Sequence, residues 1–462
     1  MSSSSSSNIQ KSNSSSSASA DQTKVKESSI EKTHISTNPK LTETLSDLLK
    51  FPLMDAVAGR RSRRFCMGAE IPDGVLAFKS KHKPMPLSEI EQLLILSTMG
   101  GVTGWHFAIM RHKGYAPYLS NYCNSPVGRT SPSAAAFTTS EIFYTDDSGI
   151  YFFPTRDFHP PLEIEDGKVD LEEFLALHKG RIQKLSDKRL YIPKQEPHMF
   201  GHNSWIANHE GSTLIIPVGD LAQHTLSSMC LLTQTGFPIY DDISKKQIPG
   251  IEKFSNIVDV NNSFPLTFME QYCLSMLTTE LSSSCYAAVL MLQAMGLGGW
   301  MYDGVNRLSV LGASGDPNVP GLGFRFDMDK ERWSIPNPTG LPGVFEGYCP
   351  PHYKNMREAV EALAKRKFGE GGVYNPNTPG AWSDSQKVRS SAKPYSDEFK
   401  ECVALQAQYI YDTYGKFPAT IPSIFLDMYI QAQHIDLDFY DHYFKPGAAY
   451  LTTHKEHMQN WH

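Results

Sequence analysis

The sequence has few of the features that mark secreted, membrane-bound or thiolate-zinc proteins. Its seven cysteines include no CxxC pair, and their odd number does not suit a disulfide framework. The N-terminal residues have neither the apolar stretch of a signal peptide nor the arginines of a transit peptide, and no segment is apolar enough to span a bilayer. We therefore expect a cytoplasmic protein with reduced thiols and no membrane partner.

Charge is also scarce. Charged residues make up 20% of the 462 residues and the net charge is −6, so the composition does not indicate a nucleic-acid surface. The 33 glycines and 30 prolines follow no period, which excludes a collagen-like or solenoid chain. Hydrophobic residues reach 40%, which is enough for a sizeable core. We expect a globular protein without a nucleic-acid partner.

Low-complexity stretches divide the chain. Ser2–Ser7 and Ser14–Ser17 are unbroken serine runs, and no aromatic residue occurs before Phe51, so the N-terminus cannot bury enough apolar surface to fold. The predicted organisation is a disordered tail at 1–47, a domain at 48–368 with an insertion at about 156–255, a linker rich in Gly, Pro, Ser and Asn at 369–395, and a helical appendix at 396–462.

Local patterns predict the main elements of an α+β fold. The clearest is a buried helix over Glu270–Met295, whose apolar residues recur at three- and four-residue steps and which Gly296 ends. Ser88 and Glu91 form a capping box at the start of another helix. Further predicted helices cover 171–177, 221–235, 355–367 and 397–414, with one more ending near His434, and predicted strands cover the hairpin 141–144 and 150–153, then 212–218 and 322–326.

A cluster of basic residues follows an expected helix end at Gly59. It reads Arg60-Arg61-Ser62-Arg63-Arg64, and guanidinium forks with a serine hydroxyl match the oxygens of a phosphate group. The alternatives are a solvated basic patch or a nucleic-acid stripe, and the acidity of the whole chain argues against the second.

Two further motifs contain small residues. The loop 128–136 carries Pro132 and Ser133, and its short side chains would let backbone groups approach a planar ligand, although an ordinary polar loop is the alternative. The glycine-rich segment 296–304 follows the long helix. A Rossmann phosphate loop instead follows a strand and opens a helix, so this motif does not indicate a nicotinamide-binding fold.

In their order and spacing, these three motifs resemble the nitroreductase-like FMN-dependent oxidoreductase family. The middle motif is most similar to the branch of azoline-forming peptide dehydrogenases, where a Pro-Ser loop runs into a strand as Pro132-Ser133 runs toward Glu141-Ile142-Phe143. The resemblance covers about residues 50–368. It departs from the family at Ala136, where simple nitroreductases commonly have asparagine, and at Ala134 and Ala135, where the azoline branch has glycines.

The resemblance implies a site for FMN built from three segments and one isolated arginine. The phosphate and ribityl chain would contact the arginine cluster, the ring would contact the Pro-Ser loop of a second subunit, and the reactive edge of the ring would meet the glycine-rich turn. The implied cofactor-binding residues are, in that order, Arg60, Ser62 and Arg64, then Pro132 and Ser133, then Asp303 and Gly304, with Arg325 as a further phosphate partner.

The implied protein is a homodimeric oxidoreductase with a mixed sheet flanked by helices and two flavins at the subunit interface. It would transfer a hydride between FMN and an unidentified small-molecule or peptide substrate, with NAD(P)H or the substrate itself as electron donor. No catalytic acid or base is assigned. Tyr302 and Asp303 occupy a suitable point of the third motif, but a buried structural role is preferred for both.

Two other functions stay open. The departure at Ala136 and the insertion allow a flavin-binding protein that has lost turnover and acts as a sensor or scaffold. The second alternative is a metal-binding or interaction protein acting through the appendix, where five histidines occur among acidic residues: His434, His442, His454, His457 and His462. We prefer aromatic and imidazole packing of a docked segment, with no metal, because these histidines are not accompanied by cysteine or an HExxH motif.

Overall fold

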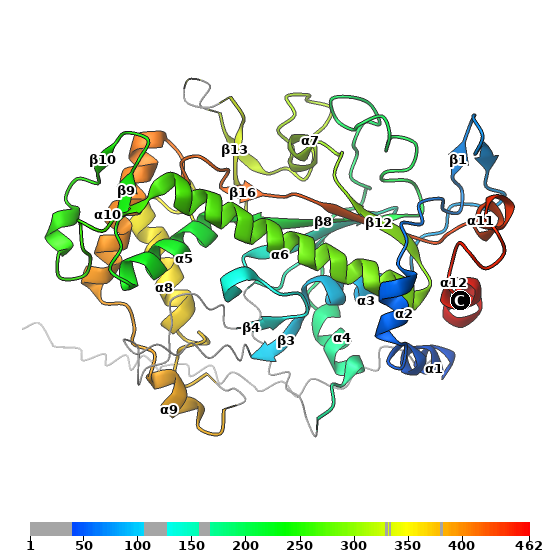
Figure 1. Cartoon of the computed structure of the whole chain (residues 1–462), viewed down its shortest axis with the longest axis horizontal. Helices are drawn as coiled ribbons and strands as arrows, with labels where there is room; N and C mark the ends of the chain where they lie inside the picture. The colour runs from blue at the N-terminus through cyan, green and yellow to red at the C-terminus, as the bar shows by residue number, and fades with distance from the viewer. Residues whose placement is uncertain (1–38, 106–126, 157–166, 329–330, 332–333, 379–381) are drawn as a thin grey trace, which may run out of the picture.

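A large antiparallel sheet with helices packed on one face forms the centre of the chain in the computed structural model (Figure 1). The structure describes residues 39–105, 127–156, 167–328, 331, 334–378 and 382–462. Helices and strands are not segregated into separate halves of the chain. The fold is α+β, as the sequence predicted.

The helices of the described residues agree with most of the local signals in the sequence. The capping box at Ser88 and Glu91 is present, and the long helix ends at Gly296 in a left-handed conformation. The helices are α1 Pro39–Leu48, α2 Leu53–Gly59, α3 Glu89–Gly100, α4 Leu171–Lys179, α5 Leu221–Gln234, α6 Leu266–Met295, α7 Arg307–Leu311, α8 Met356–Phe368, α9 Ser385–Ser390, α10 Asp397–Tyr414, α11 Leu437–Tyr443 and α12 Thr452–Trp461, with two 3₁₀ helices, η1 Ala134–Ala136 and η2 Ile251–Phe254.

The strands are mostly short, and the predicted hairpin is formed by β5 and β6. They are β1 Glu70–Ile71, β2 Phe78–Lys79, β3 Val102–Trp105, β4 Val127–Arg129, β5 Ser140–Asp146, β6 Gly149–Phe153, β7 Gln183–Ser186, β8 Thr213–Asp220, β9 Ile239–Asp241, β10 Lys246–Gln247, β11 Phe264–Pro265, β12 Gly298–Tyr302, β13 Arg325–Asp327, β14 Asn337–Leu341, β15 Phe345–Glu346, β16 Ile424–Phe425 and β17 Tyr429–Gln433.

The main sheet has seven strands in the order β12-β17-β8-β5-β6-β7, with β16 also paired to β8. Its described pairs are all antiparallel, for example Tyr144 opposite Ile215 and Trp300 opposite Gln431. A parallel pair occurs in the small sheet of β9, β10 and β11. The resemblance implied a mixed main sheet, and the antiparallel pairing is a difference from it.

Alternate side chains of each strand enter different cores, because successive strand residues point to opposite faces. Ile142 and Tyr144 pack with α3 and α6 on the helical face, whereas Phe143 packs on the other face with Trp300 and loop residues. All eight residues of β8 are buried. This explains why the sequence of β8 is apolar almost throughout rather than alternating.

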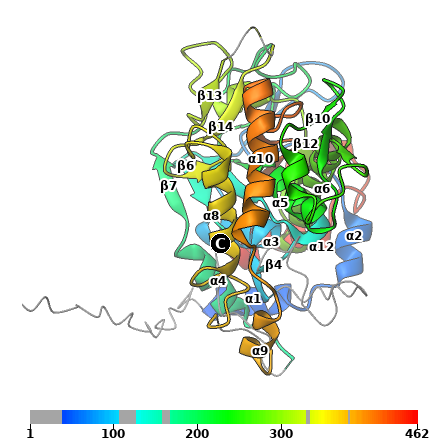
Figure 2. The same ribbon diagram turned by 90° about the vertical axis from the view of Figure 1, so that its left-hand side faces the viewer.

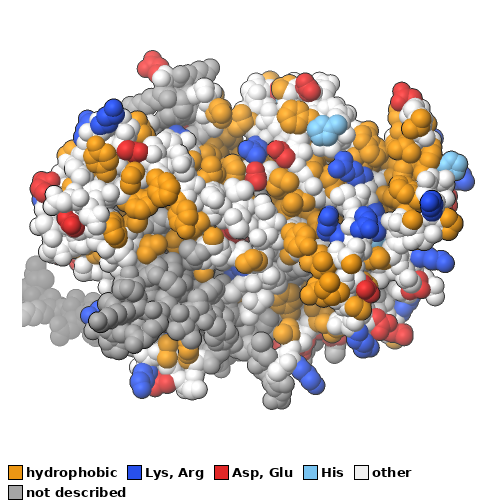
Figure 3. Space-filling model, viewed as in Figure 1, with side chains coloured by type: hydrophobic (Ala, Val, Ile, Leu, Met, Phe, Trp, Pro, Cys, Tyr) orange, Lys and Arg blue, Asp and Glu red, His pale blue; other side chains and the backbone are white. Residues whose placement is uncertain are grey.

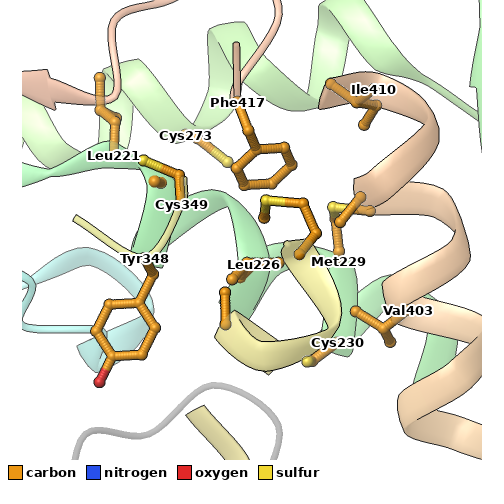
Figure 4. Packing of buried hydrophobic residues seen from close by; sticks show 14 of the residues in the cluster. Leu221, Leu226, Met229, Cys230, Cys273, Tyr348, Cys349, Val403, Ile410 and Phe417 are labelled. Atoms are coloured by element: carbon orange, nitrogen blue, oxygen red, sulfur yellow. The ribbon is translucent and has the colours of Figure 1, made fainter. Parts of the chain in front are cut away.

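A second core lies between α5, α6, α8 and α10, away from the sheet. Figure 4 shows Met229 and Cys230 of α5 close to Val403 of α10, with the Phe417 ring nearby. Seen from the end of the molecule, α8 and α10 lie side by side (Figure 2). This core joins the segment after residue 396 to the rest of the fold.

The structure differs from the expected organisation in several places. The segment 396–462 is not a helical appendix, because β17 lies inside the main sheet between β12 and β8. The expected helix ending near His434 is wrong, since β16 and β17 occupy that segment. The expected insertion at 156–255 contains β8, a strand of the main sheet whose eight residues are all buried. These differences arise because strands that pair in the sheet are remote from one another in sequence.

Both segments that we expected to be unstructured contain a helix. Helix α1 begins at Pro39, inside the tail expected at 1–47, and buries Leu45 against α3 and α12 residues. The remainder of that tail, 1–38, lies outside the described residues. The expected linker at 369–395 contains α9 and a small core of Val373, Tyr374 and Ala392.

In the described part of the chain, no helix is both long and apolar enough to cross a bilayer. Helix α6 has the length, but polar residues interrupt its middle.

Candidate functional site

The arginine segment lies along the edge of the main sheet. Helix α2 ends at Gly59, and the chain then runs beside β12, where Gly299 donates its backbone N–H to the carbonyl oxygen of Arg63 at 3.0 Å. The guanidinium carbon of Arg64 lies 5.2 Å from the centre of the Trp300 ring. The first and third sequence motifs are therefore in contact in the folded chain.

The arginines of this segment differ in environment. Arg63 is buried and donates to the carbonyl oxygens of Gly59 and Ala449 and to Oε1 of Gln293. Burial lowers its pKa to about 10. Arg63 therefore ties the end of α2 to α6 and is a structural residue.

The three residues that the sequence assigned to phosphate are more accessible. Arg60 and Ser62 are exposed and Arg64 is half-buried. Their side chains make no hydrogen bond or ion pair with the residues that the structure describes. Figure 3 shows basic side chains gathered on this face, over the region of β12 and the end of α6. The segment is available to bind an anion.

The glycine-rich turn serves the packing of the chain on itself. Gly296 has φ +79°, and a Cβ there would lie 2.1 Å from the carbonyl oxygen of Thr453 in α12. A Cβ on Gly298 would lie 2.1 Å from the Ile435 side chain, and one on Gly304 would lie 2.8 Å from Nδ2 of Asn203. The space that we expected to admit a ligand is filled by protein atoms at these three positions.

Two buried polar atoms beside the arginine segment have no hydrogen-bond partner among the described residues. They are Nε1 of Trp300 and the hydroxyl oxygen of Tyr302. The two rings stack with centroids 4.8 Å apart, and burial raises the pKa of Tyr302. Buried donors without partners are rare in native structures, and each costs about 1–3 kcal/mol.

The Pro-Ser loop lies at a different point along α6. Ser133 donates its hydroxyl to Glu280 Oε2 at 2.5 Å, and the Ser140 N–H donates to the other oxygen of Glu280 at 2.9 Å. Pro132 is exposed. Glu280 precedes Gln293, the partner of Arg63, by thirteen residues of α6, or about 20 Å along the helix axis. Within one chain this loop is remote from the arginines.

Asp303 and Gly304 line a groove with a volume of about 860 Å³. Apolar side chains such as Phe200 and Phe425 form much of its wall, and Arg307 contributes a charge. Arg307 is held by Asp427 at 2.9 Å. The size and the mixture of apolar wall and few polar groups are typical of a small-molecule site.

Arg325 lies on β13 and its guanidinium is engaged within the chain. It donates to Glu346 Oε2 at 2.7 Å and to Thr339 Oγ1 at 3.0 Å. It does not line the groove or contact the arginine segment in the described structure, so its expected phosphate role would require this ion pair to be broken.

A separate group of side chains meets at the N-terminal end of α3. Glu91 Oε1 lies near Nε2 of His434, His457 and His462. Sequence reasoning noted these histidines but interpreted Glu91 only as a capping residue, and 343 residues separate it from His434. His454 accepts the Leu451 N–H and stays outside the group. No local sequence pattern could have indicated this arrangement.

Comparison with known protein families found no match, and comparison with curated proteins found none. Among solved structures, one similar chain is described as a "putative nitroreductase" from Ralstonia eutropha JMP134. It is 12% identical, and the alignment covers 56% of this chain and 72% of that chain with a TM-score of 0.26. A superposition of this quality does not establish a shared fold, so the family of this chain stays a prediction.

Proposed function

We propose that this protein is an FMN-dependent oxidoreductase that acts as a homodimer. The observation that carries the proposal is the contact between the arginine segment and β12. Two motifs about 240 residues apart in sequence are in contact, and Arg60, Ser62 and Arg64 are exposed or half-buried, with no side-chain hydrogen bond or ion pair among the described residues. Such a set of cationic and hydroxyl donors suits a phosphate monoester.

The residues present fit the phosphate end of FMN better than its ring. The donor set is of the right chemistry, and the unpartnered Trp300 Nε1 and Tyr302 hydroxyl lie beside it. The glycines of the turn offer no cradle, because the chain itself fills their Cβ positions. FMN, when bound, would supply hydride transfer. The chain would hold its phosphate through Arg60, Ser62 and Arg64.

The position of the Pro-Ser loop supports a dimer. Pro132 and Ser133 are separated from the arginines by about 20 Å of α6, so one chain does not bring both to a single flavin. A two-fold axis across α6 would bring the loop of one chain toward the arginines of the other. The outer face of α6 carries exposed Phe268, Tyr272 and Tyr286, at 56%, 58% and 45% exposure, and apolar side chains are visible along it in Figure 3.

We assign the substrate to the groove lined by Asp303 and Gly304. Its volume of about 860 Å³ admits a small organic molecule, and its wall includes the turn that we expect at the reactive edge of the flavin. Asp303 and Arg307 would position polar groups of the substrate. The electron donor would be either NAD(P)H or the substrate, whichever of them reduces the flavin.

The test is FMN binding by arginine variants of the full chain. Each charge-assisted hydrogen bond contributes about 1.5–3 kcal/mol, so Arg60→Ala with Arg64→Ala should weaken FMN binding by roughly 10²–10⁴-fold. Flavin content after purification and FMN titration by fluorescence quenching measure this. Arg61→Ala is the matched control, because Arg61 is also exposed but donates to the backbone carbonyls of Ala58 and Arg60, and it should bind FMN as the parent chain does.

Two results would reject the proposal. One is a parent chain that binds no FMN at saturating concentration, and the other is a double variant with undiminished affinity. Anaerobic addition of NAD(P)H then tests turnover, because an oxidoreductase using this donor loses its flavin absorption band. If neither NAD(P)H nor any screened substrate reduces the bound flavin, the protein binds flavin without catalysing its reduction.

A further inference from the structure

Four side chains from three parts of the chain converge around one point near the end of α12. Glu91 lies in the first turn of α3, His434 directly follows β17, His457 lies in α12 and His462 follows it. Glu91, His434 and His457 are buried, with exposed fractions of 0%, 2% and 3%. The carboxylate Oε1 and the three Nε2 atoms all lie within 4.8 Å of one another.

Three distances between these atoms match a tetrahedral metal site, and a fourth is shorter. Glu91 Oε1 lies 2.8 Å from Nε2 of His457, 3.2 Å from that of His434 and 3.4 Å from that of His462. The Nε2 atoms of His434 and His462 are 3.3 Å apart. With metal–ligand distances of about 2.0–2.1 Å, neighbouring ligands of a tetrahedral zinc ion lie about 3.3–3.4 Å apart.

Backbone carbonyl oxygens orient two of the three imidazole rings. Nδ1 of His434 lies 3.0 Å from the Met85 carbonyl oxygen, and Nδ1 of His457 lies 2.8 Å from the Met295 carbonyl oxygen. Carbonyl oxygens only accept, so each Nδ1 carries the proton and a neutral ring turns an Nε2 lone pair toward Glu91.

A carboxylate oxygen and three imidazole nitrogens converge on one point, and a divalent cation placed there would accept a lone pair from each of them. The Nδ1–carbonyl bonds then have the outer-shell role that commonly orients metal-ligating histidines. Glu91 is oriented likewise, because its other oxygen accepts from Ser88 N at 2.6 Å and Ser88 Oγ at 2.7 Å.

We propose that Glu91, His434, His457 and His462 bind one zinc ion in a closed, structural site. Three imidazole nitrogens and one carboxylate oxygen are donors that Zn²⁺ prefers, and four protein ligands leave no position for a substrate. The ion would fasten α12 to α3 and to the end of β17. It replaces our expectation of a segment without metal, and it is independent of the proposed flavin chemistry.

The position of α12 explains what the ion would contribute. The helix lies at the edge of the molecule beside α1 (Figure 1), and its exposed residues other than Met458 are polar. His454 and His457 are its two buried residues. A helix of ten residues with so small an apolar face gains little from packing alone. A zinc ion shared with α3 would hold it in place.

The experiment measures zinc in the full chain, expressed without a polyhistidine tag and stripped of flavin. After chelation by EDTA, addition of ZnCl₂ and gel filtration, we expect one zinc per chain by mass spectrometry of the metal. We also expect the unfolding midpoint to rise with ZnCl₂, because a ligand that binds the native state stabilises it. Cobalt in the same site should give the intense visible absorption of tetrahedral Co²⁺.

Variants separate the site from other histidines. His457→Gln and His462→Gln should each weaken zinc binding by more than about 100-fold, since loss of outer-shell groups alone costs 10–100-fold. His462 has a partly exposed side chain, so its variant should keep the parent circular dichroism spectrum. His454→Gln is the matched control, because His454 is buried in the same helix but lies outside the group, and it should retain one zinc.

Three results would overturn the proposal. The first is a parent chain that holds less than a tenth of a zinc ion per molecule after loading. The second is zinc affinity that is unchanged in both His457→Gln and His462→Gln. The third is a His454→Gln variant that loses as much zinc as His457→Gln does. A weak octahedral cobalt spectrum would also reject a closed four-ligand site. FMN content is measured separately, so failure of either proposal is distinguishable from failure of the other.

Discussion

Replacement of Arg63 should destabilise the protein far more than replacement of Arg61, two residues before it. The two residues belong to the same basic cluster, but Arg63 is 3% exposed and donates to three acceptors on separate segments, Gly59, Gln293 and Ala449. Arg61 is exposed and donates only to nearby backbone carbonyls. Comparing the two variants tests whether burial or charge determines how much an arginine of this segment stabilises the fold.

The expected magnitude follows from the acceptors. A hydrogen bond to a charged group contributes about 1.5–3 kcal/mol. Gly59 and Ala449 are half-buried, so water can replace the guanidinium at their carbonyls, whereas Gln293 is buried and would lose its partner. Arg63→Ala should therefore lower the free energy of unfolding by about 3–5 kcal/mol. Arg63→Lys should recover only part of this loss, because an ammonium group cannot span all the acceptors that a planar guanidinium reaches together.

Urea denaturation of the flavin-free protein, followed by tryptophan fluorescence, measures these differences without a contribution from ligand binding. Arg61→Ala should change the free energy of unfolding by less than about 0.5 kcal/mol, as exposed substitutions usually do. If Arg63→Ala cost no more than Arg61→Ala, the buried hydrogen bonds of Arg63 would not stabilise the fold and the reasoning would be refuted.

Two further predictions concern the dimer and the pH dependence of stability. Tyr286→Asp, on the exposed face of α6, should weaken dimerisation at least about tenfold in sedimentation equilibrium because it places a charge in an apolar interface. Tyr191→Asp, at a tyrosine that is exposed elsewhere on the molecule, should not. Burial lowers the pKa of His178 to about 4, and its Nε2 accepts the Val102 N–H at 2.8 Å, so the folded state holds the neutral ring. Stability should be complete above pH 6.5 and fall as pH drops toward 4, by about 3 kcal/mol in total; a His178→Gln variant with the same acid dependence would contradict this assignment.

Elements with a local signal were predictable from the sequence. The capping box of Ser88 and Glu91 marks the start of α3, and the apolar spacing before Gly296 marks α6 and its end. The turn between β5 and β6 was likewise recognisable. These signals depend on hydrogen bonds and side-chain contacts between residues a few positions apart, so they do not require knowledge of the fold.

The role of β17 depended on tertiary structure. Tyr429–Gln433 has no strong strand pattern, and we expected a helix there, but the segment is a strand because β12 and β8 supply its hydrogen bonds from both sides. Pairing of this kind joins residues more than a hundred positions apart. Sequence patterns carry little information about it, because strand preference depends largely on neighbouring strands.

For the candidate sites, the sequence determined which residues are present and the fold determined what they can do. Arg60, Arg63 and Arg64 are the same residue type within one short segment. The packing of α2 against α6 buries Arg63 and leaves the other two available for a phosphate group. The group around Glu91 is a stronger case, because Glu91 precedes each of its three histidines by 343 or more residues. Convergence of polar atoms on one point is a property of the folded chain, since only the folded chain fixes the distances between remote side chains.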